Sequence, residues 1–312
     1  MILAVTMNPS VDISYPLNEF KLDDVNRVED VSKTAGGKGL NVARVISQME
    51  REVLATGILG GTIGDYIVKE LENDQIKNDF LKTDKESRNC IAILHEGKQT
   101  EILEAGPTLS EKEGQDFLNK FKNLLDTVSM VTISGSLPKG LPNHFYQSML
   151  EMSHKNNIPV ILDSSGESLK QTLLHDKKPF VIKPNLTELE QLLGSEVKKD
   201  VISLKAAVDN SLFEGVAWVV VSMGSEGAFV KHFNDYYQVA IPKIEVVNPV
   251  GSGDATVAGL AAALEQEEPD DAVLKTAMTV GMLNTMENGT GHIDFAQFDQ
   301  YFELVEVTKL NE

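Results

Sequence analysis

Short apolar runs that each end in a polar residue limit most strongly how this chain can fold. They lie at residues 130–134 (MVTIS), 158–163 (IPVILD), 180–183 (FVIK) and 218–222 (WVVVS). Such runs are typical of parallel strands that are buried on both faces of a sheet. Helical patterns separate them, at residues 143–154, 187–193 and 202–213. The alternation predicts an α/β fold in which helices flank a central, mostly parallel sheet.

The ends of these runs are the expected place for chemistry, because ligands of such sheets bind beyond the carboxyl ends of the strands. The polar residues at those ends are Ser134, Asp163, Lys183 and Ser222. A functional site in this chain should therefore draw on side chains and turns that directly follow the predicted strands.

Two segments interrupt the pattern, at residues 12–34 and 88–104. Both contain short alternating pieces without a helical period, and the second turns through residues 95–98 (HEGK) as a hairpin does. We interpret them as a small β-layer that projects from the main sheet and serves as a lid or a subunit contact. Because no linker or repeat is found, residues 1–312 are predicted to form one domain with this β-appendage.

The charge balance excludes several classes of partner. The chain has 28 lysines and arginines against 47 aspartates and glutamates, a formal net charge of −19. Nucleic acids and anionic membrane surfaces need a basic face, so neither is expected to bind. No apolar stretch approaches the roughly 18 residues of a membrane span, and the single cysteine, Cys90, fits a reducing compartment. The sequence predicts a soluble, cytoplasmic protein.

The segment at residues 248–254 (NPVGSGD) carries the strongest chemical signal. Its glycines let the backbone bend so that the amides of Gly251, Ser252 and Gly253 point at one spot, and the helix predicted at 255–264 adds its positive end. This arrangement suits phosphoryl oxygens, and Asp254 is placed to accept a proton from a hydroxyl group. A plain turn with Asp254 as a helix cap fits the same letters, so the residues alone leave both interpretations open.

A second glycine-rich segment, residues 35–44 (AGGKGLNVAR), runs into an amphipathic helix. Gly36 and Gly37 let a ligand approach the backbone closely, and Asn41 can hydrogen-bond sugar hydroxyls from the first helical turn. The spacing of a nucleotide-binding P-loop is absent. Asp12, near the end of the first strand, can bridge two sugar hydroxyls, although an aspartate and a di-glycine in these places also fit ordinary turns.

Two further segments follow predicted strands. Asn185 and Glu188 suit a magnesium ion and its waters beside ATP phosphates, yet Asn-x-x-Glu is also the pattern of a helix-capping box. Residues 222–227 (SMGSEG) place two glycines three apart in a loop that can admit a nucleotide, which is a weak signal because tight turns look the same.

Taken in order along the chain, these segments resemble the ribokinase-like (phosphofructokinase B) family of carbohydrate kinases. The resemblance covers essentially the whole chain and is most specific in GGKGLNVAR and GSGD. It implies a ribokinase-like fold with a small β-lid that often forms a dimer contact, and transfer of the γ-phosphoryl group of Mg-ATP to a sugar hydroxyl. Residues 12–34 and 88–104 match that lid.

The resemblance also implies a role for each candidate residue. Asp254 would deprotonate the acceptor hydroxyl while the amides of Gly251, Ser252 and Gly253 hold the phosphoryl charge. The sugar phosphate would be bound by Asp12, Gly36, Gly37, Lys38, Asn41, Arg88 and Arg27. The nucleotide would be bound by Lys183, Asn185, Ser222, Gly224, Gly227 and Asn284. Glu188 would act on Mg²⁺ through water. Arg27, Lys38 and Arg88 have a clear purpose, because a chain of charge −19 needs local cations to hold a phosphate.

For the substrate, the resemblance favours tagatose 6-phosphate, phosphorylated on its 1-hydroxyl to tagatose 1,6-bisphosphate. A fructose-phosphate kinase is the alternative, because tagatose and fructose differ only at carbon 4 and no motif reads that difference. An alternative of another class is a sensor that binds a sugar phosphate without turnover. In a sensor we would expect Asp254 or the glycines of the turn to be replaced, and both are intact. Many family members carry an acidic residue where this chain has Asn248, so activation by potassium is not predicted.

Overall fold

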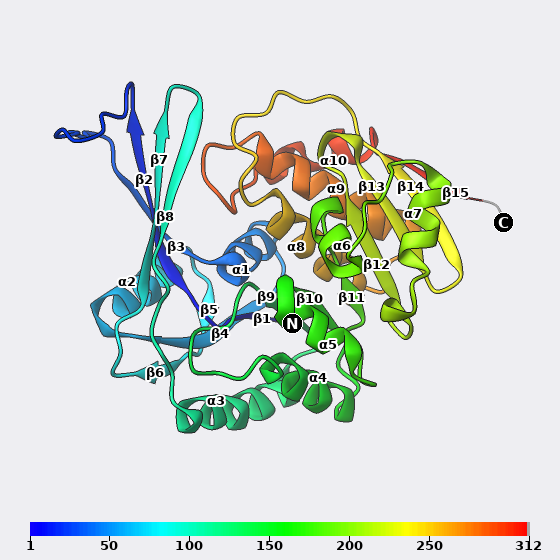
Figure 1. Ribbon diagram of the computed structural model, residues 1–312, viewed down its shortest axis with the longest axis horizontal. Helices are drawn as coiled ribbons and strands as arrows, with labels where there is room; N and C mark the ends of the chain where they lie inside the picture. Colours follow the sequence, from blue (N-terminus) through cyan, green and yellow to red (C-terminus); the bar gives the residue numbers. More distant parts are fainter. Residues whose placement is uncertain (311–312) are drawn as a thin grey trace.

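The computed structural model describes residues 1–310, and in them a twisted sheet of 11 strands forms the centre of the molecule (Figure 1). Its strands run in the order β15-β14-β13-β12-β11-β10-β9-β1-β4-β5, and β6 pairs with β4. They are β1 (Ile2–Thr6), β4 (Val53–Gly60), β5 (Lys77–Asn78), β6 (Leu81–Thr83), β9 (Met130–Ser134), β10 (Val160–Asp163), β11 (Val181–Ile182), β12 (Trp218–Ser222), β13 (Ala228–His232), β14 (Asp235–Ala240) and β15 (Glu306–Leu310). From β5 and β6 through β4, β1, β9, β10 and β11 to β12 the strands of this sheet pair in parallel, and from β12 to β15 they pair antiparallel. The predicted mostly parallel α/β sheet is confirmed.

Helices cover both faces of this sheet (Figure 1). One face carries α1 (Lys38–Gln48), α2 (Gly61–Asn73), α8 (Ser252–Glu265), α9 (Asp270–Thr285) and α10 (Phe298–Phe302). The other carries α3 (Glu111–Leu124), α4 (Phe145–Lys155), α5 (Gly166–Leu174), α6 (Leu186–Leu193) and α7 (Val201–Val208). Each set of helices packs its apolar side on the sheet and forms its own buried core. Among residues 1–310, no helix is both long and apolar enough to cross a bilayer.

The strand predicted at 180–183 forms only at Val181–Ile182, and two further predicted elements are shorter than expected for local reasons. The strand predicted at 158–163 begins at Val160, after Pro159, which has no N–H to give to a ladder. The helix predicted at 202–213 ends at Val208, and a 3₁₀ turn follows at Ser211–Phe213. The side chain of Asn210 accepts a hydrogen bond from the Leu212 N–H and so stabilises this turn in place of further helix.

A second sheet projects from one end of the first (Figure 1). It has the order β3-β2-β7-β8, with β2 (Ser10–Leu17), β3 (Ser32–Gly36), β7 (Arg88–His95) and β8 (Lys98–Leu103). The hairpin between β7 and β8 turns at Glu96 and Gly97, both of which have positive φ (49° and 69°). The two segments predicted as a β-layer thus pair with each other, and we call this sheet the lid sheet. Residues 18–31 form an irregular loop at its far end.

Candidate active site

The N-terminal end of α8 presents unused hydrogen-bond donors. Gly251, the residue before the helix, has φ +84°, a left-handed conformation that glycine adopts without strain, and no side chain caps the helix. The first N–H groups of a helix lack intrahelical acceptors, and the dipole makes this end attractive to anions. The bend and helix end predicted for residues 251–254 are therefore present, although the N–H of Ser252 is turned toward the carbonyl oxygen of Pro249 at 3.4 Å.

Asp254 lies in the first turn of α8 with only 6% of its surface exposed. Nδ2 of Asn41 donates a hydrogen bond of 2.9 Å to its Oδ2. Burial, and next the negative charge of Asp163, raise the pKa of Asp254 to about 7, against the opposing effects of Lys38, Asn41 and Lys183. A carboxylate with a pKa near neutrality is suited to accept a proton from a hydroxyl group and to release it again.

Asp163, at the end of β10, is the buried centre of an ion cluster. Its oxygens lie 3.3 Å from Nζ of Lys38 and 3.6 Å from Nζ of Lys183. The attraction of Asp163 is the main reason that the pKa of Lys38 is raised, although burial opposes it. Lys183 Nζ also lies 3.2 Å from where a Cβ on Gly253 would stand, so this lysine lies beside the start of α8. The sequence marked Asp163 only as a strand end; its pairing with two lysines was missed.

On the lid side, Asp12 is enclosed by the glycines that precede α1. Ser10 Oγ donates to its Oδ1 at 2.7 Å, and the N–H of Gly37 donates to its side chain. A Cβ on Gly36 would stand 2.1 Å from the carboxyl carbon of Asp12, so only glycine fits there. Burial raises the pKa of Asp12 in spite of these bonds and of the nearby charges of Arg88 and Arg44. The structure thus brings Asp12, Gly36 and Gly37 together as predicted.

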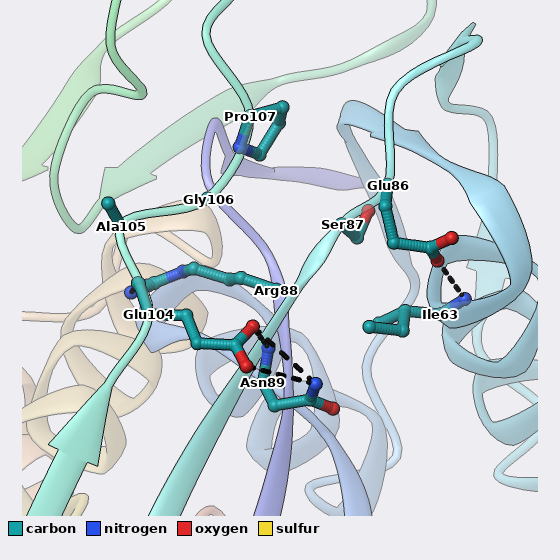
Figure 2. Close-up of a pocket in the computed structure, with 9 residues that line it drawn as sticks. All are labelled: Ile63, Glu86, Ser87, Arg88, Asn89, Glu104, Ala105, Gly106 and Pro107. Carbon is teal, nitrogen blue, oxygen red and sulfur yellow. Dashed lines mark hydrogen bonds between the residues drawn. The ribbon is translucent and has the colours of Figure 1, made fainter.

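Arg88 begins β7 beside Ser10 and borders a cavity of about 450 Å³ (Figure 2). Its Nε and Nη2 donate to the carbonyl oxygen of Asn8, and its Nη1 donates to that of Glu104. Two of its five N–H donors are left for a ligand. Glu104 and Glu86 also line the cavity, but Glu104 accepts from the Asn89 N–H and Glu86 from the Ile63 N–H, at the first turn of α2 (Figure 2).

Arg27 is separate from these groups. It is exposed on the irregular loop of residues 18–31, which in Figure 1 extends from the lid sheet away from the main sheet. The structure therefore does not bring Arg27 to the other predicted sugar-binding residues, and its contact with a sugar phosphate stays a prediction.

On the nucleotide side, Asn185 and Glu188 form the capping box that their spacing allows. The Glu188 N–H donates to Asn185 Oδ1 and the Asn185 N–H donates to Glu188 Oε2, both at 2.9 Å. An isolated parallel bridge joins Asn185 to Ser222, so these two predicted residues are neighbours. The N-terminal end of α6 is thus closed by its own side chains, in contrast to the open end of α8.

The remaining predicted nucleotide residues differ in their surroundings. Gly227 has φ +81°, and a Cβ there would stand 1.9 Å from the carbonyl oxygen of Val239, so a turn requires this glycine. Around Gly224, no atom of the described chain lies within 4 Å of such a Cβ. Asn284 is fully buried: its Nδ2 donates to the Val250 carbonyl and its Oδ1 accepts from the Gly291 N–H. It braces the loop before α8, and a direct adenine contact stays a prediction.

A metal ion would not find a complete ligand set in the protein, because residues 1–310 contain no group of three or more His, Cys, Asp or Glu side chains arranged to hold one. Glu188 uses Oε2 in the capping box, and its negative charge helps to raise the pKa of Lys38, so its carboxylate lies within electrostatic range of the ion cluster. One such carboxylate fits a magnesium ion that takes most of its ligands from phosphates and water.

Comparison with known proteins agrees with this geometry. A sequence profile of the pfkB family carbohydrate kinases matches residues 5–295. Tagatose-6-phosphate kinase of Staphylococcus epidermidis is 52% identical over 310 residues, which cover 99% of this chain and 100% of that protein. Phosphofructokinase-2 of Escherichia coli, solved in complex with potassium, superposes with a TM-score of 0.89 at 25% identity over 97% of this chain and 98% of that one.

The tetrameric inhibited form of the same Escherichia coli enzyme has a TM-score of 0.86 at 24% identity, with 97% and 98% of the two chains covered. The fold, the glycine-rich helix ends and the profile match over most of the sequence lead to one assignment. This chain belongs to the pfkB family of carbohydrate kinases.

Proposed function

We propose that this protein catalyses ATP-dependent phosphorylation of D-tagatose 6-phosphate on its 1-hydroxyl, giving D-tagatose 1,6-bisphosphate. The observation that carries the proposal is the position of Asp254, a buried carboxylate with a pKa of about 7 in the first turn of a helix whose N-terminal end is open. A base and an anion site within one helical turn are what transfer of a phosphoryl group to a hydroxyl requires. The 52% identity to a tagatose-6-phosphate kinase supports the choice of sugar.

In the proposed reaction, the 1-hydroxyl oxygen of the sugar attacks the γ-phosphorus of ATP. A new O–P bond forms, the bond from the γ-phosphorus to the bridging oxygen breaks, and ADP leaves with that electron pair. The hydroxyl proton passes to the carboxylate of Asp254, a contribution of about 10²–10⁴-fold to the rate.

Negative charge on the transferring group is balanced by the open end of α8 and by Lys183 of the ion cluster. Lys183 stands beside Asp163 and is close enough to Gly253 to meet the β- and γ-phosphates. Magnesium, held by Glu188 through water and by the phosphates, supplies further charge neutralisation when it is bound.

The sugar would lie between the lid sheet and α1. Asp12 accepts hydrogen bonds from two sugar hydroxyls, the backbone of Gly36 and Gly37 allows close approach, and Asn41 adds a side-chain contact. The two unused N–H donors of Arg88, with Lys38, bind the 6-phosphate. Arg27 joins them only when the loop of residues 18–31 folds over the sugar.

Exposed apolar side chains on the lid sheet support a homodimer. The register places Leu103 opposite Cys90, and Cys90 beside Asp12, so Leu103 lies on the face of the lid sheet that carries Asp12. Leu103 is 59% exposed and Leu94, on the same face, is 38% exposed. We propose that a second copy of the chain covers this face, in a cytoplasmic enzyme whose single cysteine suits a reducing compartment.

The test is ADP release from Mg-ATP with tagatose 6-phosphate, fructose 6-phosphate and fructose 1-phosphate in parallel. We expect the highest kcat/KM with tagatose 6-phosphate, and a decline below about pH 7 as Asp254 becomes protonated. A clear preference for fructose 1-phosphate would keep the mechanism and change the substrate. Binding of a sugar phosphate without any ADP release would instead favour a sensor.

A further inference from the structure

Arg44 is a buried cation that the roles above leave unexplained. It lies on α1, one turn after Asn41, and its side chain is only 3% exposed. Its Nε donates to Asp74 Oδ2 at 3.0 Å, its Nη1 to Asn41 Oδ1 at 3.3 Å, and its Nη2 to the Ala35 carbonyl oxygen. Burying a guanidinium is costly unless its donors are satisfied. Its fork therefore joins three places: the end of α2, the end of β3 and the Asn41 side chain.

The bond from Arg44 fixes which way the Asn41 amide faces. A guanidinium only donates hydrogen bonds, so it selects the oxygen of the amide. The NH₂ group must then point the other way, where its Nδ2 lies 2.9 Å from Oδ2 of Asp254. An ionised carboxylate only accepts hydrogen bonds, so donation runs in one direction, from Arg44 to Asn41 and from Asn41 to Asp254. The hydrogen bond from Asn41 stabilises the charged form of Asp254.

The loop on the other side leaves Asn41 little room. A Cβ on Gly291 would stand 2.9 Å from Cβ of Asn41, and the Gly291 N–H is held by Asn284. The Asn41 side chain is thus packed from one side by this loop and oriented from the other by Arg44. A half-turn of the amide would place its oxygen against the Asp254 carboxylate and its NH₂ against a guanidinium, two unfavourable contacts.

We infer that Arg44 is a positioning residue for this kinase: it orients the Asn41 amide and thereby keeps a hydrogen-bond donor on the carboxylate of Asp254. The inference rests on the proposed role of Asp254 as the base. Among the described residues, the side chain of Arg44 makes no hydrogen bond or ion pair to the start of α8 or to the ion cluster, so its effect reaches the reaction through Asn41.

Other charged groups also act on these residues and define the controls. Asp254 is influenced by Asp163, Lys38 and Lys183. Burial raises the pKa of Asp12, and the charge of Arg44 is one of the smaller effects that oppose this rise. Burial lowers the pKa of His292, and the charge of Arg44 is the next cause of that decrease. The charge of Asp74 also acts on His292. Loss of the Arg44 charge would therefore also change the pKa of Asp12 directly. The experiment must separate this effect from the effect through Asn41.

The test is the pH dependence of kcat/KM in Arg44→Gln. Without its donor, the Asn41 amide is free to turn, so we expect the acidic limb of the profile to move up by about one pH unit. Activity would fall about tenfold at pH 6 and recover at pH 9, with the KM for ATP unchanged. In the Asn41→Ala background, Arg44→Gln should cause no further movement of the limb.

Two controls accompany this variant. Asp74→Asn keeps an oxygen for Nε of Arg44 and should leave the limb in place. Phe121→Leu, in the buried core on the opposite face of the sheet, controls for lower stability alone, which reduces kcat by one factor at every pH. If Arg44→Gln does not fold, Arg44→Lys replaces it. The single ammonium group of lysine is expected to pair with Asp74 and to leave the Asn41 oxygen without a hydrogen-bond donor. The limb should then move in the same direction.

Three results would overturn the inference: an unmoved limb in the folded variant, a loss of equal size at every pH, or a full limb shift that persists in the Asn41→Ala background. Asp254→Asn is measured in the same series. If that variant keeps its turnover, the proposed base is wrong and the proposed function fails at that step. If it loses turnover while the limb of the Arg44 variant does not move, only the role of Arg44 is removed.

Discussion

Replacing Asp254 by asparagine separates what this carboxylate does for the reaction from what it does to stability. Asparagine has the same shape and keeps an oxygen that accepts from Nδ2 of Asn41, but it carries no charge. Turnover should fall by at least about 10²-fold, because the acceptor hydroxyl loses its base. The KM for ATP should not rise, because the lysines of the nucleotide site are unchanged.

The same change should stabilise the fold, and the gain should depend on pH. The pKa of Asp254 is about 7 in the folded protein and 3.8 in an unperturbed chain. Because the folded-state value is the higher one, ionisation opposes folding above pH 3.8, and the full penalty is reached above pH 7. At 1.36 kcal/mol per pH unit, the penalty is about 4 kcal/mol at pH 8 and about 2 kcal/mol at pH 5.

Thermal unfolding measures this gain. Trp218, the single tryptophan, is 2% exposed on β12 and its fluorescence reports unfolding. An unfolding entropy of about 2.1 cal/mol/K per residue converts these penalties to increases in Tm of about 6 °C at pH 8 and about 3 °C at pH 5. An equal Tm change at the two pH values, or a lower Tm at pH 8, would refute the picture of a buried, ionised Asp254. Near-normal turnover would refute its role as base.

Four other substitutions test separate parts of the site and of the proposed dimer face. Gly36→Ala places a methyl group against the Asp12 carboxyl and should raise the KM for the sugar phosphate at least about tenfold, with the KM for ATP unchanged; equal effects on both would point to general damage. Asn185→Ala removes the cap of α6 and should lower stability by about 1 kcal/mol, whereas Glu188→Gln keeps an oxygen for the Asn185 N–H and should keep Tm but need more Mg²⁺ for half-maximal rate. If Glu188→Gln lowers Tm and does not change the Mg²⁺ dependence, Glu188 has only its helix-capping role and does not act on magnesium. Leu103→Glu should convert the proposed dimer to a monomer in light scattering, and an unchanged mass would move the interface elsewhere.

The sequence predicted the framework of this protein because its signals are local. Apolar runs such as 130–134 become strands wherever helices cover both faces, and the Asn185–Glu188 spacing predicts a capping box that the structure confirms. Asp12 and Gly36 lie 24 positions apart, yet strand pairing of Ser10 with Gly36 brings their segments together. The hydrophobic pattern predicted that these segments are β-strands of the lid sheet, but it did not predict which residues pair.

What the sequence could not predict depends on burial and on contacts between distant elements. Asp163 read as one polar strand end among several, and only the fold places two lysines on it. From the sequence, Arg44 is one more residue of a predicted helix. Its orienting role depends on hydrogen bonds to Ala35 and Asp74, which belong to different elements. The raised pKa of Asp254 has the same origin, because the desolvation that causes it exists only after α8 is packed.

The pairing of Asp163 with Lys38 and Lys183 has a consequence for the order of events. Before the substrates bind, the carboxylate of Asp163 pairs with Lys38 and Lys183, whose positive charges the phosphates will need. These ion pairs hold the two lysines in place while no phosphate is bound. When phosphate oxygens take a share of those charges, the local potential at Asp254 becomes more negative and its proton affinity rises. Nucleotide binding and proton uptake are then linked, and by reciprocity a protonated Asp254 strengthens the binding of ATP. The enzyme would take up a fraction of a proton with each nucleotide, and the heat of ATP binding would depend on the buffer.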